Sequence, residues 1–271
     1  MLSTHRQERP IGSSIAAMQD HDFQGRIALI TGAASGIGAA CAEWLDRQGV
    51  AELVLVDMDG PGLEALSLSC SVRRVVGDVA DEGLWDRIET SLDRLDHAVI
   101  NAGIASGTPI VAQDYAGWKR MLAVNLDGAF LALRCSLRAM MKGSGNRSVV
   151  MLSSAAGVKP MAMTSAYGSS KAAIAHLARV AAAEHVADGI RINAIAPGRV
   201  ETPIWTKSGH FEHLVEKHGS REAAMAAIAA EVSVMGRVAQ AEDMANQIGF
   251  LLSDQAWTIT GEVLGSDCGY R

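Results

Sequence analysis

Cysteine is scarce in this chain, and its spacing follows no pattern. The four cysteines among the 271 residues are Cys41, Cys70, Cys135 and Cys268, and no two of them form a Cys-x-x-Cys pair. Disulfide scaffolds and zinc sites depend on closer, patterned cysteines. We therefore expect reduced, mostly buried thiols and no metal.

Long hydrophobic runs and an excess of basic residues are also absent. No apolar stretch approaches the ~18 residues of a membrane span. The first 25 residues mix charges with one apolar patch that is too short for a secretion signal. The net charge is −6, whereas nucleic acids and anionic membranes attract clustered Lys and Arg. These absences predict a cytoplasmic protein that acts on a small molecule, with no nucleic-acid or membrane partner.

The length of the chain suits one large α/β domain. Hydrophobic residues make up 49% of the sequence and charged residues 20%, which is enough apolar material for a sizeable core. We expect a flexible tail over residues 1–24 and a single domain over residues 25–271. Met18 is an alternative start, and the sequence alone leaves open whether residues 1–17 belong to the natural protein.

Short apolar runs alternate with helical stretches from Arg26 onward. A continuous apolar run is typical of a strand that is buried on both faces of a parallel sheet. The predicted strands cover residues 27–30, 53–56, 75–76, 98–100, 148–152, 191–195 and 261–264. The predicted helices cover residues 39–48, 62–69, 82–95, 113–142 with a break near Asn125, and 166–187.

This alternation predicts an α/β fold of the Rossmann type. We expect a doubly wound parallel seven-stranded sheet with helices on both faces, in which ligands bind beyond the carboxyl ends of the strands. An Ala-rich helical insert at residues 203–235 follows the sixth strand and is a candidate substrate lid; the alternative is an ordinary pair of surface helices. We interpret its histidines, His210, His213 and His218, as surface residues rather than metal ligands.

A glycine-rich turn lies between the first strand and the first helix. Its sequence from Thr31 to Gly38 is Thr-Gly-Ala-Ala-Ser-Gly-Ile-Gly. Glycines at this place permit a tight turn and close approach to a pyrophosphate, which the first amides of the helix can bind. The predicted contacts with a dinucleotide are Gly32, Ser35, Gly36, Ile37 and Gly38.

Asp57 ends the second strand, 19 positions after Gly38. A carboxylate about 20 residues beyond the glycines binds the adenosine ribose hydroxyls and would repel a 2′-phosphate. Asp57 and Met58 are both expected to contact the cofactor, and neither the glycine turn nor Met58 supplies a basic residue for such a phosphate. NAD is therefore the expected cofactor, although Asp57 as a plain helix cap would leave the choice open.

Two further strand ends extend the predicted cofactor site. Asp78 and Val79 follow the third strand, where they can lie near adenine. Asn101, Ala102 and Gly103 follow the fourth strand and leave room for a ribose.

Tyr167 and Lys171 are four positions apart in a helical stretch, so they share one face. A free tyrosine has a pKa of about 10, and a neighbouring ammonium stabilises the phenolate and makes it a better base. Ser154 ends the fifth strand, 13 residues before Tyr167, and its hydroxyl can hold a substrate oxygen. By its spacing, Ser153 is a structural, backbone-bonded hydroxyl. Met161 and Met163 are candidates for an apolar substrate pocket, although core packing is nearly as good an interpretation.

Taken together, these motifs resemble the short-chain dehydrogenase/reductase family in its compact single-domain branch, from about Gln24 to the C-terminus. The glycine motif, Ser154 and Tyr167-x-x-x-Lys171 match it, as does Asn125 in Met-Leu-Ala-Val-Asn. The segment Pro197-Gly198-Arg-Val-Glu-Thr202 matches the part of that family that surrounds the nicotinamide.

The resemblance implies a role for each matching residue. Tyr167 would be the acid/base, and Lys171 would lower its pKa and hold the nicotinamide ribose. Ser154 would orient the substrate oxygen, and Asn125 would keep a water in the proton relay. Further cofactor contacts would come from Tyr167, Lys171, Pro197, Gly198, Val200 and Thr202. Thr202, with the backbone near Ile195 and Val200, would fix the carboxamide. The family also implies a homotetramer built partly on the helices at residues 113–142 and 166–187.

The chain departs from the family pattern at two places. Ile100 stands where the family has the first Asn of Asn-Asn-Ala-Gly, and we expect only a local change there. Residues 265–269 read Gly-Ser-Asp-Cys-Gly in place of the usual Val-Asp-Gly-Gly, which can alter packing near the lid or subunit contacts. The leading hypothesis is an NAD-dependent oxidoreductase of secondary alcohols and ketones. The alternatives are an NADPH-dependent 3-oxoacyl reductase and a non-catalytic dinucleotide-binding regulator.

Overall fold

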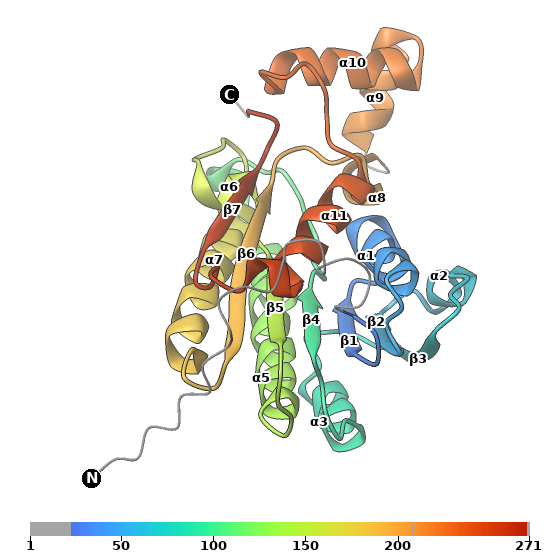
Figure 1. The fold of residues 1–271 in the computed structure, drawn as a ribbon. Helices are drawn as coiled ribbons and strands as arrows, with labels where there is room; N and C mark the ends of the chain where they lie inside the picture. Colours follow the sequence, from blue (N-terminus) through green and yellow to red (C-terminus); the bar gives the residue numbers. More distant parts are fainter. Residues whose placement is uncertain (1–22, 207–208, 270–271) are drawn as a thin grey trace.

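Seven parallel strands form the centre of the molecule in the computed structural model, which describes residues 23–206 and 209–269 (Figure 1). The strand order is β3-β2-β1-β4-β5-β6-β7, and every neighbouring pair runs parallel. This confirms the predicted doubly wound sheet. The strands are β1 (Ile27–Thr31), β2 (Glu52–Asp57), β3 (Ser71–Val76), β4 (His97–Ile100), β5 (Arg147–Leu152), β6 (Ile190–Pro197) and β7 (Val263–Ser266).

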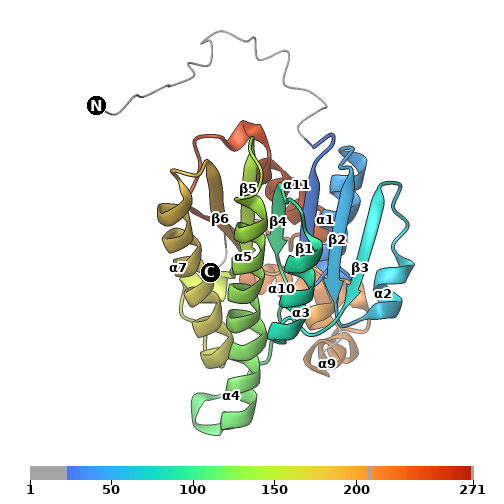
Figure 2. The same cartoon turned by 90° about the horizontal axis from the view of Figure 1, so that it is seen from below.

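Helices cover both faces of the sheet (Figures 1 and 2). Alternate residues of a strand point to opposite faces, and β1 shows this directly: Leu29 packs into one hydrophobic cluster, while Ala28 and Ile30 pack into the other. The first cluster is completed by α3 (Glu82–Ser91), α5 (Gly128–Met140) and α7 (Ser165–His185). The second is completed by α1 (Gly36–Arg47) and α11 (Ala241–Leu252).

In the described part of the chain, six further helices lie outside these two clusters or at their margins. They are α2 (Gly60–Ala65), α4 (Tyr115–Leu122), α6 (Ala155–Val158), α8 (Pro203–Thr206), α9 (Gly209–His218) and α10 (Arg221–Val232). The predicted break near Asn125 is confirmed as a turn of π-helix, Ala123–Asp127, between α4 and α5. Among the described residues, no helix is both long enough and apolar enough to cross a membrane.

Several predicted boundaries were wrong. β3 begins at Ser71 rather than Val75, because this edge strand carries polar side chains: Arg73 pairs with Glu52 at 2.8 Å. α2 begins earlier and ends earlier than predicted, because Asp59 caps it through the Gly62 amide. β7 covers Val263–Ser266 rather than residues 261–264, since Gly261 forms the preceding turn with φ +76°. α3 ends at Ser91, and α11 was not predicted at all.

The predicted tail lies mostly outside the described residues, but its last two residues do not. Phe23 is buried, with its ring 5.3 Å from that of Trp44 on α1. Gln24 forms an isolated bridge with Val50. The packed body therefore includes Phe23 and Gln24, two residues more than the predicted domain.

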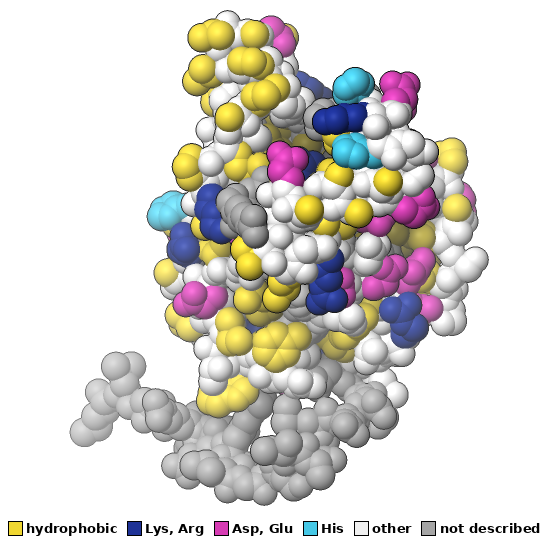
Figure 3. Space-filling model, turned by 90° about the horizontal axis from the view of Figure 1, so that it is seen from above, with side chains coloured by type: hydrophobic (Ala, Val, Ile, Leu, Met, Phe, Trp, Pro, Cys, Tyr) yellow, Lys and Arg dark blue, Asp and Glu magenta, His cyan; other side chains and the backbone are white. Residues whose placement is uncertain are grey.

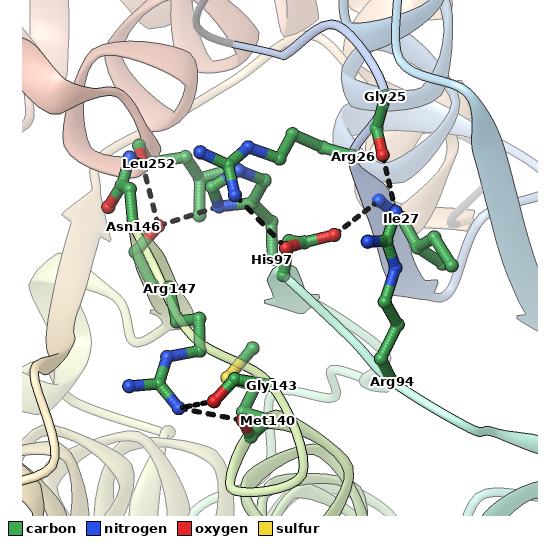
Figure 4. A network of polar contacts seen from close by, with 12 residues as sticks. Gly25, Arg26, Ile27, Arg94, His97, Met140, Gly143, Asn146, Arg147 and Leu252 are labelled. Atoms are coloured by element: carbon green, nitrogen blue, oxygen red, sulfur yellow. Dashed lines mark hydrogen bonds and ion pairs between the residues drawn. The ribbon is translucent and has the colours of Figure 1, made fainter.

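Polar groups gather at the end of the sheet where the strands begin, opposite the end that holds the candidate site (Figure 4). Asp96 accepts from the Arg26 guanidinium at 3.2 Å and from the Ile27 amide at 2.9 Å. Next to it, His97 Nδ1 lies 2.9 Å from Ser148 Oγ, which donates to the Leu252 carbonyl at 2.8 Å. This network joins β1, β4, β5 and the end of α11.

Candidate active site

The glycine turn after β1 has the conformation that the motif predicts. Gly32 and Gly36 have φ angles of +65° and +56°, which side chains of L-residues disfavour. A Cβ on Gly32 would lie 2.8 Å from Asn101 Nδ2, and one on Gly38 would overlap the Gly32 carbonyl oxygen. Glycine is therefore required here both by conformation and by close packing.

The first turn of α1 is suited to hold an anion. Ser35 precedes this 12-residue helix, its side chain makes no capping hydrogen bond, and the first turn contains no acidic residue. The amides of a helix N-terminus carry partial positive charge and bind phosphate. The turn faces a cleft of about 380 Å³. The backbone thus provides a cradle that fits the pyrophosphate of a dinucleotide.

Most of the predicted cofactor contacts line this cleft: Gly32, Ser35, Gly36, Ile37, Asp57, Met58, Asp78, Val79, Asn101, Ala102, Gly103 and Thr202. Gly38, Pro197, Gly198, Val200, Tyr167 and Lys171 are not among its lining residues. Sequence reasoning missed five residues that are: Gly77, Ile104, Val124, Pro203 and Ile204. Gly77 and Ile104 could have been predicted, because each directly adjoins a predicted residue. Val124, Pro203 and Ile204 come from other elements, and no such neighbour indicated them.

Asp57 joins the end of β2 to the glycine turn. One of its carboxylate oxygens accepts from the Ala34 amide at 2.9 Å, and the other accepts from the Asp59 amide at 2.9 Å. Asp59 caps α2, so the alternative interpretation of Asp57 as a plain helix cap is wrong. A carboxylate has about four acceptor positions, and Asp57 can therefore receive ribose hydroxyls as well. No Lys or Arg is among the residues that line the cleft.

Asp78 and Asn101 fix the neighbouring strand ends. Asp78 accepts from Arg120 at 2.8 Å and from the Ala80 amide at 3.0 Å. Burial raises the pKa of Asp78, but these two donors outweigh it and the net pKa is lowered. Asn101 donates from Nδ2 to the carbonyls of Thr31 and Gly32, both at 3.0 Å, and so holds the end of β4 against the glycine turn.

The four predicted catalytic side chains come together beside the cleft. Gly103 makes the connection: it lines the cleft, and a Cβ on it would lie 3.2 Å from Asn125 Oδ1 and 3.4 Å from Lys171 Nζ. Lys171 Nζ lies 5.8 Å from the centre of the Tyr167 ring and donates to the Leu152 carbonyl at 2.7 Å. Ser154 directly precedes α6 as its cap, and its side chain hydrogen-bonds the Tyr167 hydroxyl.

Burial governs the proton affinities in this cluster. It raises the pKa of Tyr167, and the hydrogen bond from Ser154 offsets only part of that rise. The expected net lowering of the Tyr167 pKa is therefore not found in this structure. Burial also lowers the pKa of Lys171, to about 8. Burial thus favours the uncharged form of both side chains.

Asn125 is fully buried in the π-helical turn between α4 and α5. Its Oδ1 accepts from the Ile104 amide at 2.8 Å, and its Nδ2 donates to the Ile104 carbonyl at 3.0 Å and to Ser170 Oγ at 3.1 Å. Asn125 thus fastens the loop after β4 to α7. Ser153 Oγ donates to the Lys171 carbonyl at 2.8 Å, which confirms the structural interpretation of this serine.

The end of β6 approaches the cleft from the other side. Gly36 packs against Thr202, since a Cβ on Gly36 would lie 3.2 Å from Thr202 Cβ. The altered C-terminal segment also meets this region. Gly198 lies against the backbone of Asp267, and the amides of Val234 and Met235 donate to the carbonyls of Gly269 and Cys268 at 3.2 Å. The unusual residues 265–269 are thus bonded to the chain just beyond α10.

The described part of the predicted substrate lid consists mainly of α8, α9 and α10, of which α9 and α10 are drawn at the top of Figure 1. Phe211, Ala224 and Ile228 form its own small core. Glu201 anchors it, accepting from Arg221 at 2.6 Å and from Gln240 at 3.1 Å. Both bonds lower the pKa of Glu201.

The remaining candidate residues are dispersed. The four cysteines are free, and only Cys41 and Cys135 are buried. His213 lies 4.0 Å from Glu216 on an exposed part of α9, whereas the side chain of His210 lies outside the described residues. Within residues 23–206 and 209–269, no group of three or more His, Cys, Asp or Glu side chains could hold a metal ion. Met163 is exposed, which excludes it from the core.

Comparisons with known proteins agree with this fold. The family model described as "Enoyl-(Acyl carrier protein) reductase" matches residues 32–271. Cis-4-hydroxycyclohexanecarboxylate dehydrogenase of Sinomonas cyclohexanicum is 36% identical, over 92% of this chain and 97% of that protein. Galactitol 2-dehydrogenase of Rhizobium johnstonii is 35% identical, over 93% and 97%.

A solved structure of a similar protein has the same fold. L-sorbose reductase from Gluconobacter frateurii, complexed with NADPH and L-sorbose, superposes with a TM-score of 0.86 at 28% identity, over 92% of this chain and 98% of that one. The relatives are dehydrogenases and reductases of alcohols and ketones. This chain belongs to the short-chain dehydrogenase/reductase family of oxidoreductases, whose members bind a nicotinamide dinucleotide.

Proposed function

We propose that this protein is an NAD-dependent dehydrogenase of secondary alcohols in which Tyr167 transfers the proton. The observation that carries the proposal is the position of Gly103, which lines the cleft and leaves no room for a Cβ beside Asn125 Oδ1 and Lys171 Nζ. Beside it, Ser154 and Tyr167 present two hydroxyls that are hydrogen-bonded to each other. An alcohol oxygen held between them would have a proton acceptor and an orienting group within reach.

When bound, the nicotinamide cofactor supplies the hydride acceptor or donor, and the protein orients and moves the proton. Tyr167 Oη gives a proton to a ketone oxygen in reduction and removes one from an alcohol in oxidation. Lys171 stabilises the phenolate through its ammonium charge, and Asn125 holds the loop that carries Gly103 and Ile104. Because the pKa of Tyr167 is raised, oxidation should accelerate as the pH rises, whereas reduction should be favoured at neutral pH.

Asp57 favours NAD over NADP, since its carboxylate lies in the cleft and the lining residues include no cation to receive a 2′-phosphate. The rival proposal is an NADPH-dependent reductase, and the NADPH in the similar L-sorbose reductase favours it. The names of the two relatives suggest that the substrate is a secondary alcohol on a ring or on a polyol.

A spectrophotometric assay at 340 nm tests this proposal. The purified protein would be offered cyclic alcohols, hydroxy acids and polyols, each with NAD and with NADP. We expect NAD reduction with one chemical class and a kcat/KM for NADP at least tenfold lower. Faster turnover with NADP would contradict the cofactor assignment. Binding of NADH without turnover of any substrate would favour a dinucleotide-binding regulator.

A further inference from the structure

One ion pair borders the cleft. Arg120 on α4 donates from one guanidinium nitrogen to Asp78 Oδ2 at 2.8 Å, and Asp78 is among the residues that line the cleft. The exposed fraction is 47% for the arginine side chain and 30% for the aspartate side chain. Asp78 lies just after β3, so this pair fastens α4 to the end of that strand.

The helix that carries Arg120 runs along the same part of the cleft. Arg120, Val124 and Gly128 follow one another at intervals of four residues through α4, the π-helical turn and the start of α5, and this spacing places side chains on one face. Val124 lines the cleft, and a Cβ on Gly128 would lie 2.7 Å from Val79 Cγ2. Contacts on successive turns therefore hold this face against the loop of Asp78 and Val79.

This loop lies at the end of the cleft that the adenosine would occupy. The strand order β3-β2-β1-β4 puts the ends of β2 and β3 on one side of the glycine turn and the end of β4, with Gly103, on the other. In the proposed function, the nicotinamide lies beside Gly103 and the catalytic cluster, and the pyrophosphate lies at the first turn of α1. The adenosine then lies over the ends of β2 and β3, where Asp57 and Asp78 line the cleft.

Asp78 keeps acceptor positions for a ligand. Its Oδ1 accepts from the Ala80 amide at 3.0 Å, and its Oδ2 accepts from Arg120. A carboxylate has about four acceptor positions and no donor. Adenine carries an amino group, which donates, whereas hypoxanthine and guanine carry an oxygen there, which only accepts. The Asp78 carboxylate therefore suits adenine and repels the 6-oxo purines.

We infer that Arg120 is a positioning residue, which holds the Asp78 carboxylate toward the amino group of adenine and so makes the site selective for adenine dinucleotides. Hydrogen bonds between charged groups are stronger than neutral ones. Without the guanidinium, only the Ala80 amide would orient the carboxylate, and its charge would be left unpaired near the cofactor phosphates. The inference rests on the proposed function, which sets the direction in which the dinucleotide lies.

The test compares two dinucleotides that differ only in the base, NADH and reduced nicotinamide hypoxanthine dinucleotide. Calorimetry would measure the Kd of each for the whole protein, with no substrate present. We expect NADH to bind at least about tenfold more tightly, as a hydrogen bond to a charged group permits, and Arg120→Met to remove most of this preference. Arg120→Lys should retain most of it, because a single guanidinium nitrogen bonds Asp78.

Arg138→Met is the matched control. Arg138 on α5 pairs with Glu89 at 3.1 Å, with similar exposed fractions of 54% and 29%, and neither residue lines the cleft. Its preference for the adenine dinucleotide should equal that of the unaltered protein. If Arg120→Met weakens both dinucleotides by the same factor, then Arg120 only supports the fold or the overall charge, and the inference is overturned.

A double variant shows whether Arg120 acts through Asp78. Asp78→Asn keeps an oxygen for the Ala80 amide but turns a donor toward the base, so it should remove the preference by itself. Adding Arg120→Met should then change the ratio of the two Kd values no further. A further fall in that ratio, or a greater loss of NADPH than of NADH binding in Arg120→Met, would mean that Arg120 contacts the ligand directly, which contradicts the inference.

Turnover distinguishes this inference from the proposed function. With the preferred alcohol, Arg120→Met should raise the KM for NAD about tenfold with little change in kcat, because the reacting atoms lie at the other end of the cofactor. Base selectivity equal to that of the unaltered protein, with alcohol oxidation intact, would overturn the inference and leave the proposed function standing. Base selectivity that depends on Arg120, without turnover of any alcohol, would support the inference and contradict the proposed function.

Discussion

At the scale of single residues, the two amides that donate to Asp57 give it a defined orientation in the cleft. They hold one oxygen toward the glycine turn and the other toward Asp59. If this carboxylate selects NAD through the ribose hydroxyls, then Asp57→Ala should lower the NAD/NADP preference at least tenfold, equivalent to about 1.4 kcal/mol. The ratio of kcat/KM values for the two cofactors is the measurement.

Asp59→Ala is the matched control for Asp57, because it removes a neighbouring carboxylate that caps α2. The cofactor preference should then be unchanged. Equal loss of preference in both variants would mean that the general negative charge, rather than the ribose contact, sets the selectivity.

His97 predicts a pH dependence of stability. Ser148 donates to the Leu252 carbonyl, so His97 Nδ1 must carry the proton that it shares with Ser148, and the buried Nε2 has no hydrogen-bond partner among the described residues. Burial, followed by the charges of Arg26 and Arg191, lowers the pKa of His97 to about 3. The unfolded chain, whose histidine pKa is about 6.5, therefore binds a proton that the folded chain resists.

The consequence is a loss of stability as the pH falls from about 6.5 toward 3, at up to about 1.4 kcal/mol per pH unit from this group. Chemical unfolding at several pH values would measure it. His97→Leu should show a correspondingly flatter decline, whereas His213→Leu, at an exposed position, should follow the unaltered protein. Identical slopes in all three proteins would refute this interpretation of His97.

At the scale of elements, α1 and α11 pack through a glycine. A Cβ on Gly249 would overlap the ring of Trp44, which is further held by a 2.9 Å hydrogen bond to Asn246 and by the Phe23 ring. Gly249→Ala should therefore lower the free energy of unfolding by about 1–3 kcal/mol, the usual cost of overpacking. Denaturant unfolding would measure the change.

Gly83→Ala is the control for the same substitution in another helix. A Cβ there meets no atom closer than 3.4 Å, so stability should stay the same or rise by about 0.4–1 kcal/mol. A Gly249→Ala variant as stable as this control would show that the α1–α11 contact adapts without strain.

The sequence was most informative about elements with two buried faces. β4 and β5 are continuous apolar runs with every residue buried, and both were predicted within one residue. The predicted start of β3, Val75, lies after the observed start, Ser71, because an edge strand needs only part of its surface buried. α11 was overlooked, although its buried residues recur at helical spacing. The glycine turn and the Tyr167 helix were predictable because their chemistry depends on local spacing.

Contacts between distant segments were not predictable in the same way. Nothing in the local sequence shows that Thr202 packs on Gly36 or that Asp267 pairs with Lys159. These contacts depend on how β6 and β7 lie beside the earlier strands, and Thr202 thereby joins the lining of the cleft.

At the scale of the whole molecule, the two ends of the parallel strands carry different features. A buried polar network lies where the strands begin, whereas the cleft, the candidate catalytic cluster and the helical insert lie where the strands end. The insert at residues 203–235 stays a predicted lid, supported by Pro203 and Ile204 in the cleft lining.

Exposed hydrophobic residues gather on the projecting segment around α4, at the top of Figure 3. They include Ile110, Val111 and Tyr115; Phe130 on α5 and Val180 on α7 are exposed as well. Such patches favour a protein interface. The homotetramer and the cytoplasmic location remain predictions.

The proton-transfer role of Tyr167 is the central claim, and Tyr167→Phe tests it most directly. The purified variant and the unaltered protein would be compared by NADH formation at 340 nm with the preferred alcohol, and by NADH binding. We predict a loss of turnover of at least about a hundredfold, the usual scale of general acid–base catalysis, with NADH binding retained. Turnover close to that of the unaltered protein would contradict the account.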